Sequence, residues 1–117
     1  MAFTYELLKA GEINMLNMKG KLVDKAEAVE ISVEIDEQLA EGANKFVVDL
    51  SELDYMNSTG LNIIINLMNK SRNEGGETIV AGAKPRIKAL FDVTKLSSVF
   101  TMKESVKEAQ SYFDQLA

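Results

Sequence analysis

Hydrophobic residues near the start of the chain occur in two short runs. These runs cover Phe3 to Leu8 and Glu12 to Met18, with Ala10 and Gly11 between them. Two apolar-rich segments separated by a glycine turn are typical of paired strands. The chain is therefore predicted to begin with a β-hairpin.

A longer segment with a mixed pattern follows, from Asp24 to Glu41. Some of its apolar residues alternate as in a strand, whereas others keep the spacing of a helix: Ala28, Ile31, Ile35 and Leu39. The length of the segment and the glycine that closes it, Gly42, favour a helix. We expect one helix here.

The middle of the chain is predicted to hold a buried strand followed by a loop. Lys45 to Leu50 is a β-branched and aromatic run of the kind found in central strands. The more polar stretch from Ser51 to Asn57 is expected to be the loop. This loop leads directly into the next helix.

That helix has the clearest pattern in the chain. Its apolar residues lie at helical spacing on one face: Leu61, Ile64, Ile65 and Met68. Either Asn57 or Ser58 can cap the first turn, and Gly75 with Gly76 ends the helix. The polar sequence before Leu61 is thus placed at a helix start.

Four further elements complete the chain. They are a strand at Thr78 to Ala81, a helix opened by Pro85, a strand at Val99 to Met102 and a helix at Glu104 to Leu116. The predicted order is β-β-α-β-α-β-α-β-α, in which strands separated by helices pair in parallel. We expect a single α/β domain over residues 1–117, with a mixed, mainly parallel sheet and about four helices packed against it.

Composition excludes several classes of function. The 117 residues include no cysteine and no histidine, which removes thiolate nucleophiles, the commonest general base and most zinc sites. A net charge of -5 gives no electrostatic footprint for nucleic acid or an anionic membrane. We expect no cofactor, no metal, no nucleic-acid partner and no enzymatic activity.

The N-terminal residues predict a cytoplasmic protein. Met1 to Glu6 lacks the basic start and continuous apolar core of a signal peptide, and no apolar run approaches membrane-spanning length. Membrane partners are therefore not expected.

The segment from Asp49 to Leu61 carries the most specific motif. Its last six residues read Met-Asn-Ser-Thr-Gly-Leu; weaker matches are Gly20-Lys21-Leu22, Asp49-Leu50-Ser51 and Glu108-Ala109. With these motifs, nearly the whole chain resembles the STAS domain (sulfate transporter and anti-sigma factor antagonist), and within it the stand-alone bacterial anti-sigma factor antagonists. The resemblance implies a STAS-like α/β fold.

The resemblance also implies a phosphorylation switch. In that family, the serine matching Ser58 is phosphorylated by an anti-sigma factor that is also a serine kinase, and phosphorylation weakens binding to it. A metal-dependent serine phosphatase restores the unmodified form. The residues that the resemblance assigns to partner binding are Lys21, Asp24, Met56, Asn57, Ser58, Thr59 and Gly60.

The chemistry of the motif fits such a switch. A serine at a loop-to-helix corner can be reached by the active site of another protein, and Gly60 is expected to keep that approach uncrowded. Met56 is expected to lend an adaptable contact beside Ser58. Asn57 replaces the aspartate common in the family, which keeps a capping side chain and removes its charge. Thr59 offers a second hydroxyl.

Simpler interpretations stand beside the switch. Ser58 can be a plain helix cap, and Asp49, Glu52 and Asp54 are expected to be loop acids. Lys21 and Asp24 can be ordinary solvated surface. Two other functions stay open: an unswitched STAS scaffold or accessory subunit of a larger complex such as a transport system, and a small hydrolase with Ser58 as nucleophile. The hydrolase lacks any lysine or acid next to Ser58 to activate it.

Overall fold

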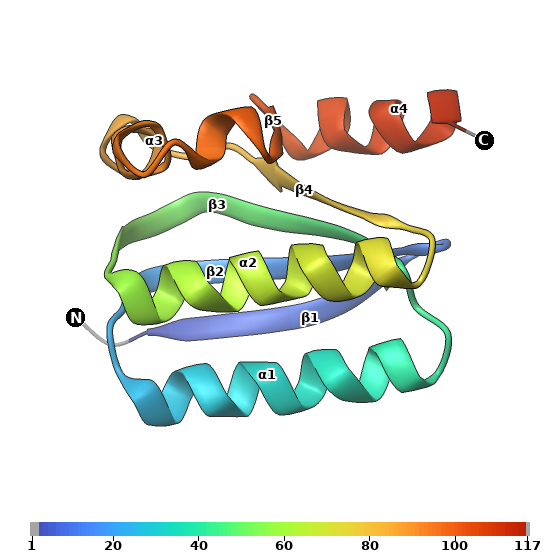
Figure 1. The fold of residues 1–117 in the computed structure, drawn as a ribbon, viewed down its shortest axis with the longest axis horizontal. Helices are drawn as coiled ribbons and strands as arrows, with labels where there is room; N and C mark the ends of the chain where they lie inside the picture. The colour runs from blue at the N-terminus through green and yellow to red at the C-terminus, as the bar shows by residue number, and fades with distance from the viewer. Residues whose placement is uncertain (1–2, 117) are drawn as a thin grey trace.

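The chain folds around one five-stranded sheet, seen in a computed structural model that describes residues 3–116 (Figure 1). The elements follow in the predicted order: β1 (Thr4–Ala10), β2 (Ile13–Leu22), α1 (Lys25–Ala40), β3 (Lys45–Met56), α2 (Ser58–Asn73), β4 (Glu77–Ala81), α3 (Pro85–Val93), the 3-10 turn η1 (Leu96–Ser98), β5 (Thr101–Lys103) and α4 (Val106–Leu116). The predicted α/β fold class is confirmed.

The strands lie side by side in sequence order, β1-β2-β3-β4-β5. β1 and β2 pair antiparallel, and the three remaining pairs are parallel. Each parallel pair is joined through a helix, since a two-residue turn cannot return the chain to the same end of the sheet. The predicted hairpin and mainly parallel sheet are confirmed.

Helices cover both faces of the sheet (Figure 1). The larger core lies between the sheet and the helices α1, α2 and α3, with Phe46, Ile64 and Phe91 fully buried in it. A smaller core on the other face seats α4 through Ala109 and Phe113 against Val47. Because both faces are covered there, β4 and the first part of β3, from Phe46 to Val48, are apolar in continuous runs.

The segment with the mixed pattern is the helix α1. Ala28, Ile31 and Ile35 face the sheet and are buried, while Val29 and Val33 are 56% and 54% exposed on the outer side. The side chain of Asp24 caps the first turn by accepting from the amide of Ala26 at 2.7 Å. Val29 and Val33, which made the sequence alternate like a strand, are therefore surface residues of a helix, and the predicted helix is confirmed.

The predicted loop from Ser51 to Asn57 is wrong, because β3 continues to Met56. Beyond the end of β4, this part of β3 pairs only with β2, from Glu52 beside Lys19 to Met56 beside Leu22. Two register shifts interrupt the pairing. Such irregularities break the usual alternation of buried and exposed side chains along a strand, so the buried Leu50, Leu53 and Met56 are spaced three residues apart. The polar residues between them made the sequence of this strand resemble a loop.

The last predicted strand is also displaced. Val99 and Phe100 belong to the turn that closes η1, where both amides donate to the carbonyl of Leu96, and β5 begins only at Thr101. Val99 and Phe100 are residue types favoured in strands, which explains the prediction. Phe100 instead packs edge-to-face on Phe91.

We predict that Gly76→Ala destabilises the protein severely. A methyl group at Gly76 would lie 1.7 Å from the backbone oxygen of Asn44, where the chain after α2 passes the start of β3. We expect unfolding by urea to show a loss of roughly 3 kcal/mol or more, because the backbone of Asn44 must move. Gly11→Ala is the control: its site is open, and its φ of +66° should cost only about 1 to 2 kcal/mol. Equal losses would contradict the prediction.

Candidate functional site

The motif residues gather at one end of the molecule, where β2 and β3 end and α1 and α2 begin (Figure 1). The backbone amide of Asn57 donates to the carbonyl of Leu22 at 3.4 Å, and its side-chain amide donates to the carbonyl of Val23 at 3.4 Å. These bonds join the segment after β2 to the start of α2. The structure thus brings together Lys21, Asp24 and the 56–60 segment, as the resemblance implies.

Asn57, rather than Ser58, caps α2. Its side-chain oxygen accepts from the backbone amides of Thr59 at 3.0 Å and Gly60 at 3.4 Å. Ser58 is the first residue of the helix and is exposed. Because the side-chain oxygen of Asn57 accepts from the amides of the first turn, the hydroxyl of Ser58 is not needed as a cap and is available for other chemistry.

Two motif residues lie beneath this surface, which corrects their expected roles. Met56 is 1% exposed and forms part of the core, so it offers little direct contact to a partner. Gly60 is buried, and a methyl group there would come within 2.9 Å of Met56 and 3.1 Å of Leu22. Gly60 is therefore needed for close packing of α2 on the strand ends, and not to clear the approach to Ser58.

The other predicted contacts remain at the surface. Lys21 and Asp24 are exposed, although Asp24 also caps α1, and Thr59 is half-buried behind Ser58. A visiting protein therefore meets Ser58 more fully than Thr59.

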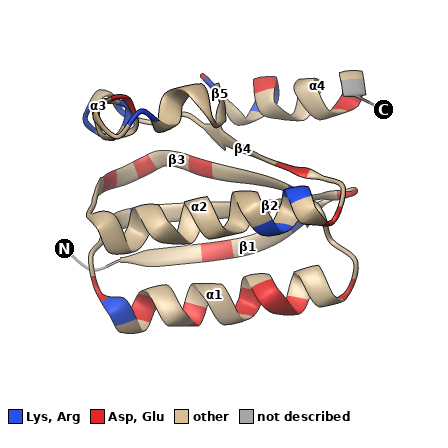
Figure 2. Ribbon diagram, viewed as in Figure 1, with Lys and Arg blue, Asp and Glu red and all other residues tan. Residues whose placement is uncertain are grey.

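The end of the molecule where α2 begins carries both basic and acidic residues, in a chain that is acidic as a whole (Figure 2). Lys84 forms a 2.6 Å ion pair with Asp54. The hydrogen bond and charge of Lys84 hold the pKa of the Asp54 carboxyl below its usual range; desolvation opposes this, while the charges of Lys21 and Arg86 act in the same direction. Three cations thus act on the Asp54 carboxylate, and the carboxylate of Asp24 lies exposed at the same end of the molecule.

A mainly apolar groove runs next to Ser58, between the end of β3 and α3. It has a volume of about 360 Å³ and is lined by Tyr55, Met56, Asn57, Ser58, Arg86, Ile87, Ala89, Leu90 and Val93. Val93 is 80% exposed and Tyr55 is 40% exposed. Large apolar side chains that stay exposed beside a concave surface are typical of a protein-binding site.

Sequence reasoning missed the half of this groove that α3 provides. The sequence predicted a helix opened by Pro85, but Val93 falls outside the face that Ile87 and Phe91 bury. An apolar side chain on the polar side of a short helix was the available signal.

The acids expected in a loop have local partners. Glu52 pairs with Lys19 at 3.2 Å, Asp54 pairs with Lys84, and Asp49 accepts from the backbone amide of Ser51 at 3.0 Å.

Over residues 3–116, no helix has the length and apolar character required to cross a membrane.

Comparison with known proteins finds one family model and several relatives that match this chain. The family model of the STAS domain matches residues 5–109. BtrV of Bordetella bronchiseptica, a predicted anti-sigma factor antagonist, is 28% identical over 92 residues, which are 79% of each chain. The anti-sigma-B factor antagonist of Listeria monocytogenes is 34% identical over 56 residues, 48% of this chain and 49% of that one.

Solved structures share the same fold. An anti-sigma factor antagonist from Mycobacterium paratuberculosis superposes with a TM-score of 0.83, at 21% identity and over 95% of this chain and 93% of the other. The phosphorylated form of SpoIIAA from Bacillus gives a TM-score of 0.73, at 21% identity and over 99% and 100% of the two chains. At this level of identity, the likeness concerns the fold.

We predict that Asn57→Ala lowers the free energy of unfolding by about 1 kcal/mol, because the first turn of α2 loses its cap. Asn57→Asp should lose less than Asn57→Ala, since an aspartate caps as well and its charge suits a helix start, while it gives up only the long 3.4 Å hydrogen bond to the carbonyl of Val23. Urea unfolding of the three proteins measures the difference. A loss of the same size in Asn57→Asp would show that capping is not what the residue contributes.

Proposed function

This chain belongs to the STAS domain family, and we propose that it is an anti-sigma factor antagonist switched by phosphorylation of Ser58. Unmodified, it binds an anti-sigma factor that is also a serine kinase; phosphorylated, it is released. The observation that carries the proposal is an exposed serine at the start of a capped helix, on the rim of an apolar groove. The names of its relatives BtrV and the Listeria antagonist support the same role.

Docking would use the groove between β3 and α3. Exposed Val93 and half-buried Leu90 offer apolar area, and Tyr55 adds an aromatic side chain with a polar tip. Such residues are favoured at the centres of interfaces, while charged residues suit the rim. Lys21 and Arg86 would supply that rim and favour an acidic partner surface.

A phosphate on Ser58 would disturb the complex more than the fold. It would add about -1.5 to -2 charges at the positive end of α2, where negative charge is tolerated, and Asn57 would keep its cap. Arg86 lines the same groove and is suited to pair with the phosphate in the released form. A partner that covers Ser58 would have to desolvate that charge, which costs several kcal/mol.

The partner proteins would catalyse both the transfer of the phosphoryl group to Ser58 and its removal. The neighbour of Ser58 is the amide of Asn57, which is no general base, so the kinase would supply ATP and the base. A metal-dependent serine phosphatase would hydrolyse the phosphoserine and restore the binding form. We place this cycle in the cytoplasm.

Phosphorylation at Ser58 is tested by incubating the chain with a purified anti-sigma factor that has serine kinase activity. We expect Ser58→Ala to lose all labelling by radioactive ATP and Thr59→Val to keep it, because Thr59 is the more buried hydroxyl. Ser58→Asp, which only partly imitates a phosphate, should weaken binding by about tenfold or more, or roughly 1.4 kcal/mol.

Two outcomes would overturn this assignment. Labelling that persists in Ser58→Ala would move the modification elsewhere, and equal binding by wild type, the fully phosphorylated protein and Ser58→Asp would indicate an unswitched scaffold. Circular dichroism of each variant controls for folding.

The groove is tested by placing a charge in it. Val93→Asp should weaken binding to the same anti-sigma factor about tenfold or more, because the carboxylate would be buried in an apolar contact. Val33→Asp is the matched control: this valine is also exposed, but it lies on the outer side of α1 away from the groove. Titration calorimetry measures both, and equal effects would exclude the groove as the docking surface.

A further inference from the structure

The two edges of the sheet differ in their protection against another chain. β5, at one edge, is three residues long, whereas β1, at the other edge, runs for seven residues. Edge strands are usually short, bulged or interrupted by proline, because their free amides and carbonyls can pair with a further strand. β1 contains no proline, and its pairing with β2 is regular over all seven residues. Its outer edge can therefore accept a strand.

The turn between β1 and β2 fixes which backbone groups of β1 are free. Gly11, at a φ of +66°, opens a two-residue turn, and Ala10 is the last paired residue of β1. In such a hairpin the residues that flank the turn exchange two hydrogen bonds, and so does every second pair along the strands. The amides and carbonyls of the alternate residues therefore point away from β2: Tyr5, Leu7 and Lys9.

These three residues are complementary to a second copy of themselves. If two β1 strands run antiparallel with Leu7 opposite Leu7, then Tyr5 of each copy lies opposite Lys9 of the other. Every outward-pointing group within β1 is then paired. A shift of one residue would set outward-pointing groups against groups already bonded to β2, and a shift of two would leave one end of each strand unpaired.

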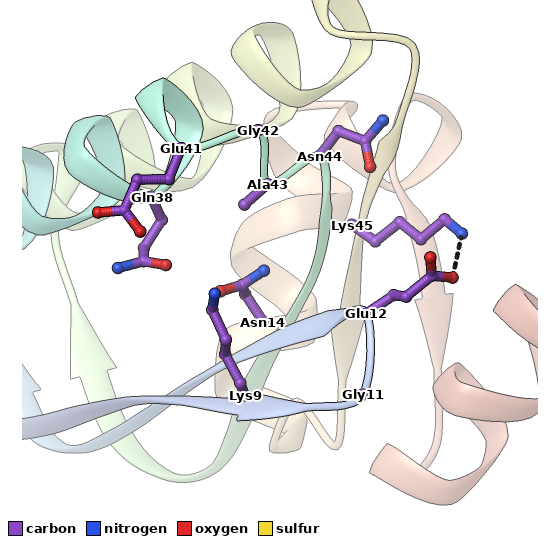
Figure 3. Close-up of a pocket in the computed structure, with 10 residues that line it drawn as sticks. All are labelled: Lys9, Gly11, Glu12, Asn14, Gln38, Glu41, Gly42, Ala43, Asn44 and Lys45. Atoms are coloured by element: carbon purple, nitrogen blue, oxygen red, sulfur yellow. Dashed lines mark hydrogen bonds and ion pairs between the residues drawn. The ribbon is translucent and has the colours of Figure 1, made fainter.

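Charge favours the same register. The hydroxyl of Tyr5 donates to Glu34 and, at 3.3 Å, to Glu30, both on α1. Among residues 3–116, no ion pair involves Lys9 or either glutamate. Lys9 extends from β1 on the side where α1 lies (Figure 3). In the pair of strands, its ammonium group comes beside the two carboxylates next to Tyr5 of the other copy, and symmetry repeats this contact.

The opposite face of β1 adds an apolar contact. Leu8 is 49% exposed on this face, because α4 packs against β3, β4 and β5 and leaves most of the β1–β2 hairpin open. In the same register, Leu8 lies opposite Glu6 of the second copy and diagonal to its Leu8, within reach of a side-chain contact. Two exposed leucines would thus cover each other.

We propose that two copies of this chain form a dimer by joining their β1 strands antiparallel, with Leu7 at the two-fold axis. The two five-stranded sheets become one continuous sheet. Because the same surface of each copy is used, the contact closes on itself and leaves only the short β5 strands at the edges. The dimer does not depend on the switch proposed above, since Ser58 begins α2 and is not part of this edge.

Sedimentation equilibrium of the full chain tests for the dimer. We expect the mass to rise from that of one chain at about 1 µM to that of two chains at about 1 mM. A single chain at every concentration would overturn the proposal.

Two changes at Lys9 should each weaken the dimer at least tenfold. Lys9→Glu sets a carboxylate against Glu34 of the other copy, and Lys9→Pro removes an outward-pointing amide without breaking a bond to β2. Lys107→Glu is the matched control: it makes the same change of charge on the exposed side of α4 and should leave the dissociation constant unchanged. Circular dichroism checks that each variant folds. A dimer that withstands both changes at Lys9, or one that Lys107→Glu weakens equally, would contradict the proposed interface.

Disulfide cross-linking tests the register, in a chain that has no cysteine of its own. Glu6 would form a non-hydrogen-bonded pair with Leu8 of the other copy, where Cα atoms lie about 4.5 Å apart, within the range of a disulfide. Both side chains are exposed, so cysteine is tolerated at either position. A mixture of Glu6→Cys and Leu8→Cys should form the mixed disulfide, identified by mass spectrometry, faster than either variant forms its own. Equal rates for the three products would exclude this register.

Discussion

The parallel pairing of β2 with β3 is the constraint on which the rest of the structure depends. It runs the full length of both strands, past the end of β4, and its last step sets Leu22 beside Met56. The next residue, Asn57, can then bond to the carbonyls of Leu22 and Val23 and still cap α2. Gly60 allows the helix to sit on these strand ends without a clash. A hydroxyl at position 58 is consequently held at a fixed place on the surface.

This arrangement separates stability from signalling. The fold is held by Met56, Gly60 and the Asn57 cap, all at or below the surface, whereas Ser58 contributes little to either core. A charge added to Ser58 therefore meets the favourable end of a helix dipole within the domain and an unfavourable, desolvated environment only in a complex. The proposed phosphate on Ser58 would therefore leave the fold intact.

Local patterns predicted the elements well where one face is buried in a regular way. The spacing of Leu61, Ile64 and Met68 placed α2 correctly, and the glycines placed its end. Prediction failed for Ser51 to Met56, since the irregular pairing with β2 spaces the buried residues by three and exposes polar ones between them. It also misjudged Met56 and Gly60, because a motif that surrounds an exposed serine does not tell which of its neighbours face inward.

The sequence by itself determined the order of the elements, the family resemblance and the position of Ser58 at a helix start, because each is written in neighbouring residues. Only the tertiary structure decided that Val93 and Leu90 border that serine, and that Glu30 and Glu34 lie beside Tyr5 on the outer strand. These residues lie more than 20 positions apart along the chain. Hydrophobic periodicity reports which side of an element is buried, whereas a groove depends on which elements pack together, and that follows from the strand order of the sheet.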